Sequence, residues 1–132
     1  MTEYDFRRYV AAFNANDYAG FGAFYADDVV FELGSMKRIV GREAILDFYR
    51  DVKSKVRETL DILSVAVGPD AMAVHVATEF YGLVDWPDFI AGPLMKGEAL
   101  HIESIGYYYL RDGKFARILG ARLKTAAPIK GE

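Results

Sequence analysis

Hydrophobic residues recur along the first segment of the chain at the spacing of an α-helix. They occupy positions i, i+3, i+4 and i+7, as expected for one buried stripe, at Phe6, Tyr9, Val10 and Phe13. Thr2 and Asp5 have the spacing of a capping box at the start of this helix. Asp17 can cap a short second helix, which carries Phe21, Phe24 and Tyr25. The pattern therefore predicts two packed helices at the beginning of the chain.

The pattern then changes from helix to strand and back again. Residues 29–31 form a β-rich run, and "GREAILDFYRDVKSKV" returns to helical spacing with an apolar stripe at Ile45, Phe48, Tyr49, Val52 and Val56. From residue 58 onward the alternation predicts an antiparallel meander, with strands at 58–67, 71–85, 98–111 and 114–125. Asp112-Gly113 joins the last two strands and is a strong hairpin signal. Helices followed by a curled sheet predict an α+β fold.

Composition and charge narrow the classes of function. The 132 residues contain no long linker or repeat, so we expect a single domain over residues 1–132. The net charge is -3 and the basic residues are scattered, which argues against a nucleic-acid partner. There is no apolar run of membrane-spanning length and no apolar leader, so we expect a cytoplasmic protein without a membrane partner. With no cysteine and only two histidines, we expect no metal and no cofactor.

Strand pairing predicts which side chains share the inner face of the sheet. In a hairpin closed by Asp112-Gly113, directly opposite residues lie on one face, and counting back from the turn pairs residue 107 with 118 and residue 103 with 122. This count places five residues on the cavity face: His101, Glu103, Ile105, Tyr107 and Arg122. On the strand over residues 71–85 it places Val74, Val76, Thr78 and Phe80 inside. His75, Glu79 and Tyr81 then belong to the outer face.

Three stretches of the sequence resemble one superfamily. "YVAAFNANDYAGFGAFYADDVVFEL", "GREAILDFYRD" and the terminal hairpin "LRDGKFARI" are similar to the nuclear transport factor 2-like superfamily. Its members include the SnoaL-like polyketide cyclases, ketosteroid isomerase, scytalone dehydratase and limonene epoxide hydrolase. The resemblance covers nearly the whole chain. It implies a cone-shaped, curved antiparallel sheet wrapped around three N-terminal helices, a cystatin-like α+β barrel.

The resemblance also implies site residues. The hydrogen-bonded tyrosines of ketosteroid isomerase fall on Tyr9, Tyr25 and Tyr49, whereas its general base falls on Leu33 and its oxyanion-hole aspartate near Ile105. Two polar pocket residues of scytalone dehydratase fall on His101 and Glu103. The catalytic triad of limonene epoxide hydrolase would fall among Val74, Val76, Thr78 and Gly120, which cannot supply it, so epoxide hydrolysis by that triad is not expected.

These positions predict a mainly apolar cavity with a small polar group. We expect His101, Tyr9 and Tyr49 to be catalytic, because an imidazole can move a proton at neutral pH and a phenol can donate to a carbonyl or enolate oxygen. The remaining predicted substrate contacts are Tyr25, Leu33, Val74, Val76, Thr78, Phe80, Trp86, Glu103, Ile105, Tyr107 and Arg122. The predicted function is a cofactor-independent lyase, dehydratase or isomerase that abstracts a proton next to a carbonyl of a hydrophobic cyclic or aromatic molecule.

Each of these residues also has a structural interpretation. The tyrosines can be core residues with satisfied hydroxyls, His101 can form a structural hydrogen bond, and Glu103 can pair with Arg122. Trp86 is either a lid over the cone or an anchor to a partner subunit. The alternative function is therefore a non-catalytic, small-ligand-binding or interaction module. In both interpretations we expect a homodimer that associates through the outer sheet face.

Three acids in "YADDVVFEL" are not expected to carry chemistry. Asp27 and Asp28 lie where a helix is predicted to end and a strand to begin, so turn and capping roles are expected for them. Glu32 has the opposite strand parity to Leu33, which predicts an outward side chain.

Overall fold

The computed structural model describes residues 1–130 as three helices and six strands. In chain order these are α1 (Glu3–Asn14), α2 (Tyr18–Gly22), β1 (Tyr25–Leu33), β2 (Lys37–Val40), α3 (Arg42–Lys55), β3 (Val56–Val67), β4 (Ala71–Gly82), β5 (Glu98–Arg111) and β6 (Lys114–Lys130). None of these helices is long and apolar enough to cross a membrane.

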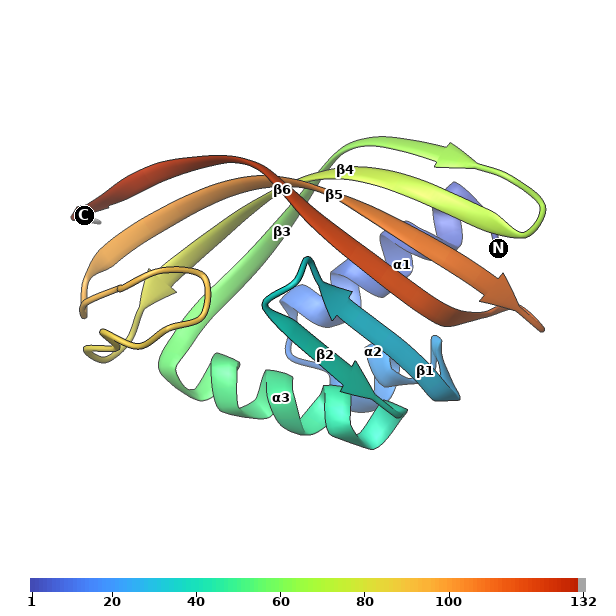
Figure 1. The fold of residues 1–132 in the computed structure, drawn as a ribbon, viewed down its shortest axis with the longest axis horizontal. Coiled ribbons are helices and arrows are strands. Elements are labelled where there is room, and N and C mark those ends of the chain that lie inside the picture. Colours follow the sequence, from blue (N-terminus) through green and yellow to red (C-terminus); the bar gives the residue numbers. More distant parts are fainter. Residues whose placement is uncertain (131–132) are drawn as a thin grey trace.

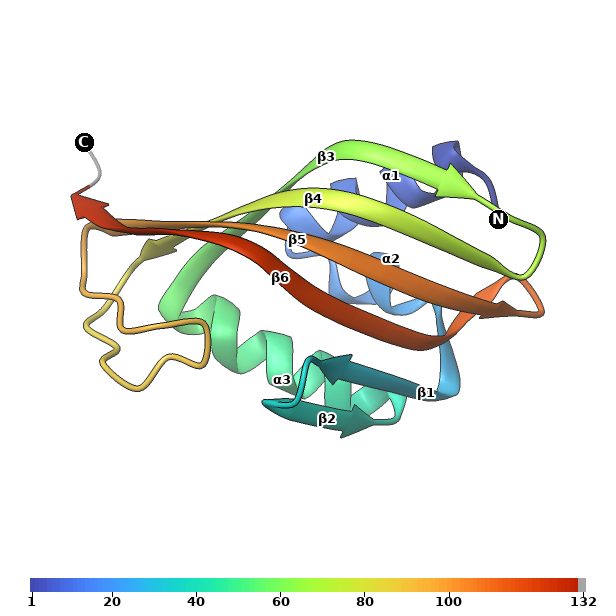
Figure 2. The same ribbon diagram turned by 45° about the horizontal axis from the view of Figure 1, so that its top comes forward.

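The strands form one curved sheet in the order β2-β1-β6-β5-β4-β3 (Figure 1). The four long strands bend over the helices, while α3 and the β1–β2 hairpin lie together beneath them (Figure 2). All neighbouring strands are antiparallel except β1 and β6, which run parallel. The predicted α+β fold, with a curved sheet around N-terminal helices, is confirmed, and the sheet does not close into a barrel.

The predicted helix starts are present in the structure. Thr2 and Asp5 form a reciprocal capping box, with the Asp5 amide donating to the Thr2 hydroxyl over 3.1 Å. The Asp17 carboxylate accepts from the Gly20 amide at 2.9 Å and caps α2. These side chains satisfy backbone donors that a helix leaves unpaired in its first turn.

Two element boundaries differ from the predicted ones. Tyr25 starts β1 rather than ending α2, and Val56 starts β3 rather than continuing α3.

The side chains of β4 that point inward are the ones predicted from the alternation of the sequence. Every second residue along β4 is buried, including Val74, Val76, Thr78 and Phe80, and the residues between them are only partly buried. This pattern of a half-buried strand places His75, Glu79 and Tyr81 on the outer face, as expected. The inner side chains pack against aromatic residues of the helices, which form the main hydrophobic core.

The predicted pairing of β5 with β6 is wrong by one residue from Tyr109 to Ser104, and by two residues from Glu103 to His101, where Leu123 is a second extra residue in β6. β6 contains an extra residue, Ala116, between the partners of Leu110 and Tyr109, so that Tyr108 rather than Tyr107 faces Ile118. A bulge of this kind moves every following side chain of the partner strand to the opposite face. The inner face of β5 therefore carries Leu100, Ile102, Ser104, Gly106 and Tyr108, the register partners of Phe80, Thr78, Val76, Val74 and Met72.

The three acids of β1 point away from the core. Asp27 pairs with Arg42 at 2.9 Å, and Asp28 pairs with Arg111. Glu32 accepts hydrogen bonds from the Arg117 guanidinium at 2.9 and 3.1 Å. Asp27 and Asp28 belong to β1 itself, in the stretch where its register against β6 shifts, instead of to a turn before the strand.

Candidate functional site

A cavity of about 390 Å³ lies between the concave face of the sheet and the helices. Its floor is formed by α1 and α3, and its walls by the inner faces of β3, β4, β5 and β6. The mouth is bordered by the β1–β2 turn, by residues 89–91 of the β4–β5 loop and by residues 121–122 of β6. The lining is mostly apolar, with a few polar groups, which is the usual composition of a small-molecule site.

Half of the residues predicted for the site have side chains in this lining. The structure places seven of them there: Tyr9, Leu33, Tyr49, Val76, Thr78, Phe80 and Arg122. Ile105 borders the cavity between Ser104 and Gly106, but it is opposite His75 of β4, so the expected inward position of its side chain is wrong. Leu33 occupies the position of the isomerase base, so that this part of the wall is apolar. Val74 and Tyr25 are 1% exposed and lie behind the lining, within the core.

The expected cavity positions of His101, Glu103 and Tyr107 are wrong. The bulge in β6 turns these three side chains to the outer face, where Glu79 and Ala77 of β4 face His101 and Glu103. His101 is hydrogen-bonded to Glu79 at 3.1 Å, and His75 to Glu103 at 2.7 Å. Because the sheet separates His101 from the cavity, it cannot transfer a proton to a molecule bound there.

Trp86 is also outside the cavity lining, contrary to expectation. Its ring stacks on Phe89, with centroids 4.6 Å apart, and the Lys55 ammonium lies 4.5 Å from its centre. Phe89, not Trp86, faces the cavity. The tryptophan therefore supports the β4–β5 loop from behind and holds Phe89 at the mouth.

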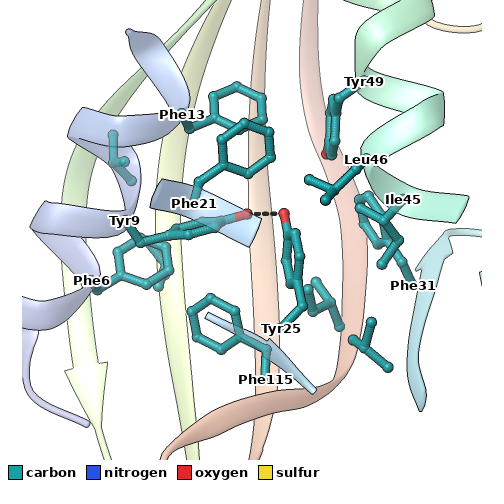
Figure 3. Close-up of a cluster of buried hydrophobic side chains, with 14 of the residues drawn as sticks. Phe6, Tyr9, Phe13, Phe21, Tyr25, Phe31, Ile45, Leu46, Tyr49 and Phe115 are labelled. Atoms are coloured by element: carbon teal, nitrogen blue, oxygen red, sulfur yellow. Dashed lines mark hydrogen bonds between the residues drawn. The ribbon is translucent and has the colours of Figure 1, made fainter. Parts of the chain in front are cut away.

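Three tyrosine hydroxyls lie in the interior of the cone (Figure 3). The Tyr9 and Tyr25 hydroxyls are hydrogen-bonded at 2.6 Å, and the Tyr49 hydroxyl points toward this pair from α3. Burial raises the pKa of all three phenols well above the usual value. Tyr9 and Tyr49 therefore remain protonated at neutral pH and can donate hydrogen bonds into the cavity.

A fourth tyrosine, Tyr108, approaches the same region from β5. It lines the cavity, and burial also raises the pKa of its hydroxyl. Its ring occupies the space above Gly106, where a Cβ atom would come within 2.8 Å of the Tyr108 ring. Glycine at position 106 therefore leaves room for this phenol on the inner face.

Glu58, on β3, is the one carboxyl group in the described cavity lining. Burial raises the pKa of Glu58 to about 7, while the nearby Lys53 ammonium opposes this shift. The ion pairs of the described residues do not include Glu58. Its negative charge also contributes to the raised pKa values of Tyr49, Tyr9 and Tyr25. A carboxyl group that titrates near neutral pH among protonated phenols is suited to general acid–base catalysis.

Lys53 supplies a fixed positive charge beside this group. It is 7% exposed, its ammonium donates to the Phe13 carbonyl at 2.9 Å, and it lies 3.8 Å from the centre of the Phe13 ring. That carbonyl is in the last turn of α1, where the helix dipole favours a cation. Lys53 is thus bound to α1 and acts on Glu58 through space rather than through an ion pair.

Glu58 is absent from the sequence-based prediction, which applied strand parity only to the strands after β3. Val56, Glu58, Leu60 and Ile62 alternate along one face of β3, and Glu58 is the only acid among these otherwise apolar residues. A carboxylate at an inward position of a strand is uncommon unless it is paired or functional. This alternation along β3 could have identified Glu58 from the sequence alone.

The described residues contain no cluster of three or more His, Asp or Glu able to hold a metal.

Comparison with known proteins agrees with this architecture. A family model described as the SnoaL-like domain matches residues 6–118. The chain belongs to this family. The resemblance to SnoaL-like and ketosteroid isomerase-like proteins of the nuclear transport factor 2-like fold is confirmed. No curated protein matches the chain.

Solved structures show how widely this fold is shared. A putative polyketide cyclase from Pseudomonas putida is 25% identical, with a TM-score of 0.77 over 89% of this chain and 87% of that one. An epoxide hydrolase from M. tuberculosis similar to limonene epoxide hydrolase is 14% identical, with a TM-score of 0.73 over 90% and 80%. A ketosteroid isomerase-like protein from Catenulispora acidiphila, in complex with trimethylamine, is 11% identical, with a TM-score of 0.73 over 92% and 86%. The last two show the fold alone.

Proposed function

We propose that this SnoaL-like protein is a cofactor-independent lyase, dehydratase or isomerase that abstracts a proton next to a carbonyl of a hydrophobic cyclic or aromatic molecule. One observation carries the proposal: Glu58 opens into a mainly apolar cavity beside Tyr9 and Tyr49. Glu58 replaces His101 as the proposed base. The two phenols keep the role that the sequence predicted for them.

The proposed reaction begins with proton transfer to Glu58. The Glu58 carboxylate takes the proton from the carbon beside the carbonyl, and the electrons of that C–H bond move into an enolate. The Tyr9 and Tyr49 hydroxyls, whose raised pKa values keep them protonated, donate hydrogen bonds to the enolate oxygen. Return of the proton to another carbon gives isomerisation. Dehydration results instead when the enolate expels a hydroxyl from the β-carbon and the protonated Glu58 gives it the proton, so that it leaves as water.

The cavity walls suit an apolar substrate. Phe31, Phe48, Phe80 and Ile102 contribute apolar surface around the polar groups, and a dry environment strengthens hydrogen bonds to a developing oxyanion. The similar structure that was solved with trimethylamine indicates that this fold can accept a small organic molecule.

Hydrogen–deuterium exchange tests the proposal without knowledge of the natural substrate. The protein is incubated in D₂O with 2-tetralone or 2-decalone, one aromatic and one alicyclic ketone, and loss of the protons beside the carbonyl is followed by NMR. We expect exchange faster than in buffer alone for at least one ketone. Exchange at the buffer rate for both ketones, although the protein binds them, would contradict the enzyme proposal and favour the non-catalytic ligand-binding alternative.

The outer face of the sheet is the proposed dimer interface. It exposes Tyr107 and Tyr109, each 40% accessible, with ring centroids 5.1 Å apart, and the Arg117 guanidinium lies over the Tyr109 ring. Aromatic residues and arginine are enriched in protein interfaces. Light scattering is expected to give twice the chain mass for the wild-type protein and a lower mass for Tyr107→Lys. A monomeric wild-type protein at micromolar concentration would contradict this proposal.

A further inference from the structure

One cationic side chain lines the cavity near its mouth, and a second lies next to residues of the lining. Arg122 lines the cavity where β6 continues past the end of β1, and its register partner on β5, Ser104, also lines it. Lys37 begins β2 opposite Leu33, another lining residue, and its ammonium is 5.9 Å from the centre of the Phe48 ring. The two cations thus flank the β1–β2 turn.

The backbone fixes the relative position of these two sites. The Gly34 amide in the β1–β2 turn donates to the Gly120 carbonyl of β6 at 2.9 Å, which ties the turn to the strand two residues before Arg122. Figure 1 shows the tip of the β1–β2 hairpin close to the middle of β6. Arg122 is therefore part of the rim itself, and Lys37 directly follows the last rim residue of the turn, Met36.

Neither cation is neutralised within residues 1–130. None of the ion pairs there includes Arg122 or Lys37. Arg122 donates only to the Thr125 hydroxyl, over 3.3 Å. The chain as a whole carries a net charge of -3, and the acids Asp61, Glu79 and Glu103 lie in a groove on the outer face. The two cations without carboxylate partners therefore give this region a positive charge, although the net charge of the chain is negative.

We propose that Arg122, assisted by Lys37, binds an anionic group of the substrate, so that the substrate is an amphipathic organic anion. Its charged end stays at the mouth and its apolar body enters the cavity. The Glu58 carboxylate in the interior repels a second anion, so an anionic ligand binds in one orientation, with its uncharged end toward Glu58 and the phenols. This inference deepens the proposed function by naming the substrate class. It concerns binding and does not require that a reaction follows.

A pair of fluorescent probes tests the charge preference directly. 8-Anilinonaphthalene-1-sulfonate carries one sulfonate, and N-phenyl-1-naphthylamine has the same aromatic body without it. We expect both to bind the wild-type protein and to displace each other. Arg122→Gln should weaken binding of the sulfonate about tenfold, as expected for loss of a charged hydrogen bond, and change binding of the neutral probe less than about twofold.

Arg50→Gln is the matched control, because Arg50 pairs with Asp47 on the outer side of α3 and is not part of the cavity lining. It should leave the affinities of both probes unchanged. Raising the sodium chloride concentration should weaken only the sulfonate, since salt screens exposed charges. Equal losses of both probes in Arg122→Gln, no loss of either, or no binding to the wild-type protein would each overturn the proposal. Because ketone exchange is measured separately, failure of this inference and failure of the proposed reaction are distinguishable.

Discussion

Glu58→Gln is expected to reduce ketone exchange by at least about 100-fold, the lower end of what a positioned general base contributes. The amide has nearly the same shape as the carboxyl group but cannot accept the proton. The substitution should therefore leave binding of 2-tetralone within about threefold of wild type, while the rate of exchange in the bound state falls. NMR-detected exchange at several ketone concentrations separates these two effects.

Glu79→Gln is the matched control for this variant. It makes the same chemical change on the outer face of β4, where Glu79 is hydrogen-bonded to His101 and is separated from the cavity by the sheet. Its exchange rate should equal that of the wild type. An unchanged rate in Glu58→Gln, or an equal loss in Glu79→Gln, would remove Glu58 as the base.

The same Glu58→Gln substitution is expected to stabilise the protein at alkaline pH. The pKa of Glu58 is raised to about 7 in the folded state, so folding favours the protonated form. The contribution of this group to stability is full below the ordinary pKa of a glutamate and is lost as the pH rises through about 7. A tenfold change in proton affinity corresponds to about 1.4 kcal/mol, and the carboxyl group is partly accessible to the cavity, so we expect a gain of about 2 kcal/mol at pH 8.

Urea denaturation at pH 4 and pH 8 measures this effect. The two proteins should have similar free energies of unfolding at pH 4, where Glu58 is neutral, and Glu58→Gln should be more stable at pH 8. In Lys53→Met the loss of stability caused by ionisation of Glu58 should continue to a higher pH than in the wild type, because the Lys53 ammonium lowers the pKa of Glu58. A destabilised Glu58→Gln at pH 8 would show instead that the carboxylate is favourably paired in the folded state.

Local patterns predicted the order of helices and strands, whereas the curved sheet around the helices was implied by the family resemblance. The helical stripe from Phe6 to Phe13, the cap at Asp17 and the alternation along β4 depend on neighbouring residues, and each is present in the structure. The short strand β2 was missed because it has only four residues and begins with the charged Lys37 and Arg38, and its pairing with β1 comes from the tertiary structure.

The site was harder to predict, because it depends on strand register. Counting from the Asp112-Gly113 turn assumes a ladder without bulges, but Ala116 interrupts it and moves His101 to the outer face. Arg122 does lie in the cavity lining, as predicted. That prediction depended only on alternation within β6 and not on the register of β6 against β5. Glu58 required only parity within β3, so the sequence alone could have identified it, whereas the misplacement of His101 came from a bulge that local sequence does not specify.

The titration of the Glu58 carboxyl group tests the central claim most directly. The side-chain carboxyl carbon can be followed by ¹³C NMR in glutamate-labelled protein and identified by its loss in Glu58→Gln. We predict a midpoint near pH 7, as expected for a carboxyl group buried in the cavity beside Lys53 and the phenols. A midpoint at or below the ordinary glutamate value of about 4.3 would contradict the account, because Glu58 would then lack the raised pKa on which its proposed role as the base depends.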